Sequence, residues 1–235
     1  LTVQLRQDTV RYDAQMAFPE GRAAARGSAR LAAPLAYAVD RGQLTSVDVA
    51  ALLGDTTTSA LSGSFTLRGT DTNPASMQLT ANVELQDSHY GGYRLRRATS
   101  RLSLSRGRAD VDATADVHGG QFELTATATP FTDPLTLRTT RGRFRDVDIG
   151  PLLQAPTQGS DLDGTFSLRG EQRADDPWGR WTARVTLDTS RFNQQPLHAA
   201  RLNATLQAAR VDADLTLDTP SGRSRLAGYA ADLDT

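Results

Sequence analysis

The chain has 235 residues, of which 38% are hydrophobic and 23% are charged, so it holds enough apolar material for a buried core. Its formal net charge is −1 and its acids and arginines are interspersed, so no basic surface indicates a nucleic-acid partner. The chain lacks cysteine and lysine, which excludes disulfides, thiolate metal sites, a Walker-A phosphate loop and Schiff-base chemistry.

An internal repeat organises the chain. Residues 34–53, PLAYAVDRGQLTSVDVAALL, recur at 134–153 as PLTLRTTRGRFRDVDIGPLL, and residues 61–69, LSGSFTLRG, recur at 162–170 as LDGTFSLRG. Residues 79–90 are similarly matched by residues 181–192. The repeat predicts the end of a preceding unit at 1–33, a full β repeat at 34–133, and a second, truncated β repeat at 134–235. We expect a continuous sheet rather than separate domains.

Each repeat is predicted to hold one short helix followed by strands. Asp48 and Asp148 precede apolar residues at helical spacing, and each acid is expected to cap a helix at 49–53 or 149–153. Further along the chain, apolar and polar residues alternate through 102–104, 111–117 and 122–128, which indicates strands with one buried face. Turn residues at 106–107, 119–120, 130–134 and 220–222 separate these strands and predict antiparallel hairpins.

No run of apolar residues is long enough to span a bilayer as a helix, and the chain begins at Leu1 rather than Met. We therefore expect this sequence to be part of a longer protein.

The repeated motifs resemble those of the AsmA-like superfamily, especially its TamB-type members. The motif residues are Val47-Asp48-Val49, Leu52-Leu53, Leu61, Gly63, Phe65 and Gly69, with counterparts Val147-Asp148-Ile149, Leu152-Leu153, Leu162, Gly164, Phe166 and Gly170. The resemblance implies an envelope protein anchored in the inner membrane that crosses the periplasm as a long, curled antiparallel β-sheet with an apolar groove. It also implies either phospholipid transport between inner and outer membranes, or assistance to outer-membrane protein assembly with a barrel-insertase partner.

The alternating apolar positions predict the lining of such a groove. A continuous apolar lining favours phospholipid acyl chains, each buried CH₂ contributing about 0.8 kcal/mol, and it requires no catalytic group or cofactor. We expect a protein that is not an enzyme. The predicted lining residues are Val83, Leu85, Leu102, Leu104, Phe122, Leu124, Val185, Leu187, Leu202, Leu206, Leu215 and Leu217.

No pattern in the chain predicts a metal site. The three histidines, at 89, 118 and 198, lack the spacing of a zinc helix. The aspartates at 110, 112 and 116, and at 212, 214 and 218, alternate along predicted strands and are interpreted as a solvated face rather than a calcium loop. Trp181 is interpreted as a core strand residue, whereas the role of Trp178 is left open.

Two other hypotheses stay open. Repeats near 100 residues also suit an extracellular, adhesin-like array of β-sandwich domains. The helix-like segment and the absence of a tryptophan from the first repeat favour the groove over this alternative. The third hypothesis is a structural scaffold without a ligand.

Overall fold

The computed structural model describes residues 1–48, 58–90, 93–117, 120–150 and 159–231. Within these ranges the chain contains β-strands and no helix, so none of the described residues forms a helix able to cross a membrane. All strand pairings in the described ranges are antiparallel, which confirms the predicted all-β antiparallel fold. The chain divides into two compact units, Leu1–His118 (unit 1) and Gly119–Thr235 (unit 2).

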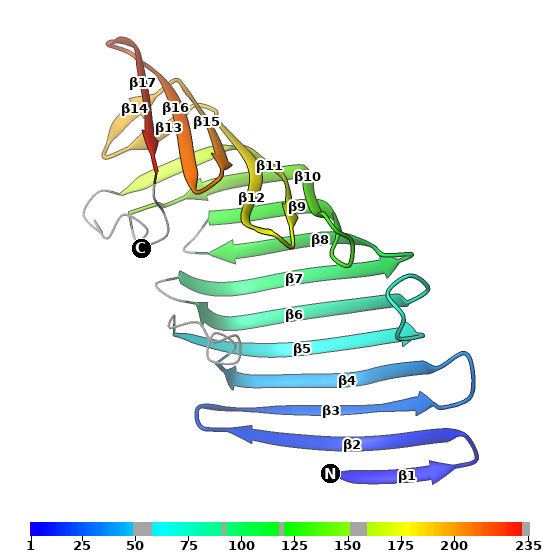
Figure 1. Cartoon of the computed structure of the whole chain (residues 1–235). Coiled ribbons are helices and arrows are strands. Elements are labelled where there is room, and N and C mark those ends of the chain that lie inside the picture. The colour runs from blue at the N-terminus through cyan, green and yellow to red at the C-terminus, as the bar shows by residue number, and fades with distance from the viewer. Residues whose placement is uncertain (49–57, 91–92, 118–119, 151–158, 232–235) are drawn as a thin grey trace. The chain divides into compact units, whose positions relative to one another are not determined.

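Unit 1 is a meander in which each strand pairs with the next along the chain (Figure 1). No pairing between β1 and β8 closes the sheet in the described part of this unit. The strands are β1 (Thr2–Arg6), β2 (Thr9–Phe18), β3 (Gly21–Arg30), β4 (Ala36–Val47), β5 (Ser59–Thr70), β6 (Gln78–Tyr90), β7 (Tyr93–Ser105) and β8 (Arg108–Val117).

Unit 2 is also an open meander, interrupted by one small hairpin. β12 pairs with β15 directly, while β13 and β14 pair with each other and β13 extends along the start of β11. This succession of neighbours differs from the two facing sheets of the sandwich hypothesis. The strands are β9 (Gly120–Thr129), β10 (Leu135–Val147), β11 (Ser160–Arg173), β12 (Asp176–Leu187), β13 (Ser190–Phe192), β14 (Gln195–Leu197), β15 (Ala199–Gln207), β16 (Arg210–Thr219) and β17 (Gly222–Ala230).

The period-two pattern gives each sheet one apolar and one polar face. Residues directly opposite each other in neighbouring strands share a face, so the register shows which side chains meet. In unit 1, Leu79 lies opposite Leu104, and Val83 lies opposite Phe65. Their sequence neighbours project from the other face, as Asn82 does opposite Arg101. The alternation read from the sequence therefore assigns the faces correctly through these strands.

Several strands end where the sequence places turns. β7 ends at Ser105 and β8 begins at Arg108, and the two residues between them, Arg106 and Gly107, have φ values of 51° and 74°. Two consecutive residues with positive φ match the right-handed twist of a hairpin. β9 and β10 likewise flank residues 130–134, and β16 and β17 flank residues 220–221.

The predicted helices at 49–53 and 149–153 fall mostly outside the described residues. The acid expected to cap the second one does accept local hydrogen bonds. Asp148 Oδ1 accepts the Gly150 N–H at 2.9 Å and the Ser160 N–H at 3.0 Å. Asp48 accepts a hydrogen bond from the Ser59 hydroxyl at 2.7 Å. Both acids thus bond to the first residue of the next strand, Ser59 of β5 or Ser160 of β11.

Local features recur at matched positions of the two sequence repeats. The bonds Ala33–Pro34 and Asp133–Pro134 are both cis, and Ser46 and Asp146 have φ values of 52° and 53°. Buried Ser88 and buried Ser190 each accept a backbone N–H from the neighbouring strand, at 2.9 and 3.1 Å.

Candidate functional site

An apolar cavity of about 320 Å³ lies on the apolar face of unit 2. Its walls come from β9, β10, β11, β12, β15 and β16, together with one residue that follows β10. The lining residues are Phe122, Phe144, Val147, Ile149, Leu162, Val185, Leu187, Ala200, Leu202 and Leu215.

Two phenylalanines line the cavity, Phe122 and Phe144, and a third, Phe166, packs beside them. The Phe144 ring centroid lies 6.3 Å from that of Phe122 and 6.4 Å from that of Phe166, on three neighbouring strands. Glycines give these rings room: a Cβ at Gly164 would lie 2.9 Å from Phe144, and one at Gly142 would lie 2.8 Å from Phe166. The glycines of the repeat thus let aromatic rings lie flat over the backbone of the adjacent strand.

A β-bulge in β10 brings Val147 to the cavity. Phe144 lies opposite Gly164 and Val147 lies opposite Leu162, with a register shift between the two pairs. Residues three apart in a regular strand project from opposite faces, but the extra residue of a bulge restores the same face. Phe144, Val147 and Leu162 are consequently all buried and form one cluster.

The cavity has no charged or hydrogen-bonding side chain among its described lining residues. Such a lining cannot stabilise an ion or orient a polar substrate, because buried polar groups require hydrogen-bonding partners. It can hold a flexible hydrocarbon, whose transfer from water is favourable in proportion to the area buried. The described lining is therefore suited to apolar contacts.

The structure brings five of the predicted lining residues into the cavity, and leaves others on the same face beside it. Leu124 lies opposite Gly142, Leu206 opposite Trp181, and Leu217 opposite Ala200, so these three lie on the apolar face outside the cavity wall. The five residues in the cavity are Phe122, Val185, Leu187, Leu202 and Leu215.

The sequence reasoning did not include Phe144, Val147, Ile149, Leu162 or Ala200 among the lining residues. Phe144 follows Gly142 in strict alternation, and Leu162 belongs to the repeated glycine motif, so both carried a usable signal. Ile149 belongs to the helix predicted at 149–153. Trp181 lies in β12, half-buried, and its indole N–H donates to the Trp178 carbonyl at 2.9 Å.

The predicted lining residues of unit 1 lie on the apolar face of that unit. Leu85 is opposite Ala98 and Leu102 is opposite Val111. Leu104 is only 6% exposed, next to Ala109 on β8, while Val83 is half-buried.

Three acids of unit 2 could together hold a cation. Asp146, Asp161 and Asp163 each place one carboxylate oxygen within 4.8 Å of the others. Sequence reasoning missed this group because it depends on pairing between β10 and β11. The Asp146 N–H donates to Asp163 Oδ1 at 3.1 Å, so part of the group serves the local bulge.

The other acids and histidines considered as metal ligands lie apart from the cavity lining. Asp110 and Asp212 form exposed ion pairs with Arg108 and Arg210, at 3.0 and 2.7 Å. His89 and His198 are exposed, and His118 lies outside the described residues.

Comparisons with known proteins add no family to this description. No protein-family model, no curated protein and no solved structure matches the chain.

Proposed function

We propose that this chain binds phospholipid acyl chains on its apolar sheet face, as a segment of an envelope protein that carries lipid between the inner and outer membranes. The protein acts without a catalytic step or a cofactor. The observation that carries this proposal is the cavity of unit 2, whose described lining consists of apolar side chains alone.

The energy available from this cavity is sufficient for reversible binding. At about 0.8 kcal/mol per buried CH₂, roughly five methylenes contribute about 4 kcal/mol, close to a thousandfold in affinity. This binding energy adds up along the acyl chain and does not depend on the direction in which the acyl chain lies. A surface of this kind can therefore hold an acyl chain at successive positions without a single tight site.

The repeats extend this proposal beyond the cavity. We propose that successive repeats present successive stretches of one apolar groove, with residues 34–133 and 134–235 as neighbouring units of the series. Register shifts recur at matched positions of β4 and β10, before Val47 and Val147, as do the buried serines Ser88 and Ser190, and this recurrence supports the arrangement. The resemblance to the AsmA-like superfamily supports a periplasmic location, an inner-membrane anchor, and a barrel-insertase partner that contacts other parts of the protein.

A pair of adjacent substitutions tests lipid binding. Val185→Asp adds a charge to the cavity lining, whereas Thr186→Asp adds the same charge to the opposite face, across from Arg201. Each protein is mixed with phosphatidylethanolamine vesicles, reisolated and analysed by mass spectrometry for retained phospholipid. We expect Thr186→Asp to retain the wild-type amount and Val185→Asp to lose at least nine-tenths of it.

Circular dichroism of both variants verifies that the sheet persists. Equal lipid retention by the two folded variants, or no retention by the wild-type chain, would contradict the proposed function.

A further inference from the structure

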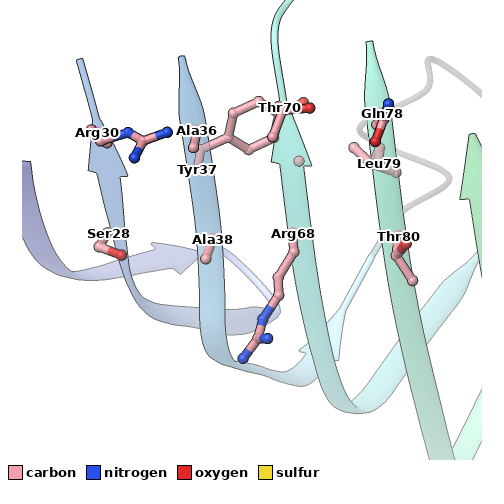
Figure 2. Close-up of a pocket in the computed structure, with 11 residues that line it drawn as sticks. Ser28, Arg30, Ala36, Tyr37, Ala38, Arg68, Thr70, Gln78, Leu79 and Thr80 are labelled. Atoms are coloured by element: carbon pink, nitrogen blue, oxygen red, sulfur yellow. The ribbon is translucent and has the colours of Figure 1, made fainter. Parts of the chain in front are cut away.

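A second hollow, of about 470 Å³, lies in unit 1 and has a different chemistry. It is lined by residues of β3, β4, β5 and β6 (Figure 2). The register places Arg30, Ala36, Thr70 and Gln78 in one row across these four strands, and Ser28, Ala38, Arg68 and Thr80 in the next. These eight residues, here called the arginine trough, share one face of the sheet because directly opposed residues project from the same side.

Two alanines explain why the face is hollowed here. Ala36 and Ala38 supply only methyl groups on β4, while longer side chains stand on β3 and β5 on both sides. Figure 2 shows the Arg30 side chain reaching from β3 toward Ala36, and Arg68 leaving β5 beside Ala38. Ala36 and Ala38 form the floor of the trough. The Tyr12 hydroxyl of β2 donates a hydrogen bond to the Ala38 carbonyl at 3.0 Å.

The charges of the trough are uncompensated. In the part of the chain that the structure describes, neither Arg30 nor Arg68 has an ion-pair or hydrogen-bond partner, and no acid lines the trough. The nearby carboxylate of Asp71 is occupied by its own loop, where it accepts hydrogen bonds from the Thr72 and Asn73 N–H groups at 2.7 and 3.2 Å.

The two guanidinium groups flank donors suited to an anion. Arg30 and Arg68 stand at diagonal positions two strands apart, so their Cα atoms are separated by about 12 Å, and both side chains can extend over the alanine floor. Hydroxyl groups of Ser28, Thr70 and Thr80 line the same space. Guanidinium binds phosphate through paired, charge-assisted hydrogen bonds, and hydroxyl groups add further donors.

We infer that the arginine trough binds the phosphate group of an anionic ligand, either a free phosphorylated solute or a phospholipid headgroup. This site is separate in residues and in chemistry from the apolar cavity of unit 2. It does not depend on the proposed acyl-chain binding.

The second repeat provides an internal comparison. At the matched positions of β10 and β11, Thr136 and Arg138 replace the two alanines, and Glu171 replaces Thr70. Glu171 lies opposite both Thr136 and Arg180, so a carboxylate stands within the counterpart rows. In those rows the Arg138 side chain, opposite Arg169, stands in place of the alanine floor, and the Glu171 carboxylate stands in place of a hydroxyl donor, where it would repel a bound phosphate. The inference therefore assigns phosphate binding to the first repeat.

Calorimetric titration of the whole chain with inorganic phosphate at low ionic strength tests the site. Arg30→Gln and Arg68→Gln are each expected to weaken phosphate binding about tenfold, the loss typical of one charge-assisted contact. Arg22→Gln, on β3 outside the trough, is expected to change the affinity less than twofold. Thr70→Glu, which copies the second repeat, abolishes binding, whereas Gln43→Glu on β4 preserves it.

A vesicle assay then distinguishes the two ligand sources. If the ligand is a headgroup, more of the wild-type chain than of Arg30→Gln cosediments with phosphatidylglycerol vesicles, and free phosphate removes the difference. If the ligand is a solute, phosphate binds and the arginine substitutions do not alter vesicle binding. Absence of phosphate binding, or equal affinity in the wild type and in folded Arg30→Gln and Arg68→Gln, overturns the inference. Val185→Asp leaves phosphate binding unchanged, so failure of one proposal is separable from failure of the other.

Discussion

Filling the apolar cavity should weaken lipid binding strongly without weakening the fold. Ala200 is 6% exposed, lies between Leu187 and Leu217, and lines the cavity. In Ala200→Phe the ring enters existing space and displaces roughly four acyl methylenes. At about 0.8 kcal/mol each, about 3 kcal/mol of binding energy is lost, which lowers the affinity roughly 200-fold.

The unfolding free energy gives an independent measurement for the same variant. Overpacking a filled core costs about 1–3 kcal/mol, whereas a ring that fills a cavity adds buried apolar area and stabilises the fold. We therefore expect the urea midpoint of Ala200→Phe to equal or exceed that of the wild type. Ala199→Phe, one residue earlier and opposite Asp218, is the control that retains lipid binding. Unchanged lipid affinity in a stable Ala200→Phe would refute the reasoning, as would destabilisation by more than about 3 kcal/mol.

Three further predictions concern the fold. Gly164→Ala places a Cβ 2.2 Å from a carbonyl oxygen of β12 and should cost at least about 2 kcal/mol in urea unfolding, whereas Gly228→Ala meets nothing within 4 Å and should be neutral or stabilising by about 0.5 kcal/mol. Ser190→Ala removes an acceptor 3.1 Å from an N–H of β11 and should lower the unfolding free energy by about 1–3 kcal/mol; an unchanged urea midpoint would contradict its structural role. Hydrogen bonds led by that from Ser76 hold the pKa of Asp71 below its ordinary value of 3.8, so their contribution is present above that pH and lost as the pH falls through the depressed pKa. Ser76→Ala should raise this pKa toward 3.8 in an NMR titration, and an identical titration curve in both proteins would exclude the assigned cause.

Much of the fold was predictable because hairpin signals and alternation are local. Arg106-Gly107 forms a turn whatever lies elsewhere in the chain, and Phe122 to Ala128 alternates through the whole of β9. Face assignments followed from the same pattern. The pattern does not predict which residues of the apolar face line the cavity. Leu124 and Leu202 both alternate with polar residues, but only Leu202 lines the cavity.

The cavity wall was less predictable because it depends on a bulge. Period two places Phe144 and Val147 on opposite faces, and the register shift at Arg145 and Asp146 places them on the same one. The residue pattern of one strand does not indicate a register shift, because the shift depends on pairing with the partner strand. Ile149 also lines the cavity, although its sequence motif predicts a helix.

The arginine trough was not predictable from the sequence because alanine occurs on both the apolar and the polar face of a sheet. Ala36 and Ala38 read as core residues in a chain rich in small aliphatics, yet they lie on the face that also carries Arg68 and Thr70. Their partners are set by pairing across β3, β4 and β5, which the sequence does not show directly.

Photo-crosslinking tests the central claim most directly. Benzoylphenylalanine is placed at Leu215, in the cavity lining, or at Thr216, on the opposite face of β16, and the protein is irradiated with phospholipid vesicles. The account predicts a phospholipid adduct by mass spectrometry at position 215 and none at position 216. Equal adducts at the two positions, or none at 215 in the folded protein, would contradict it.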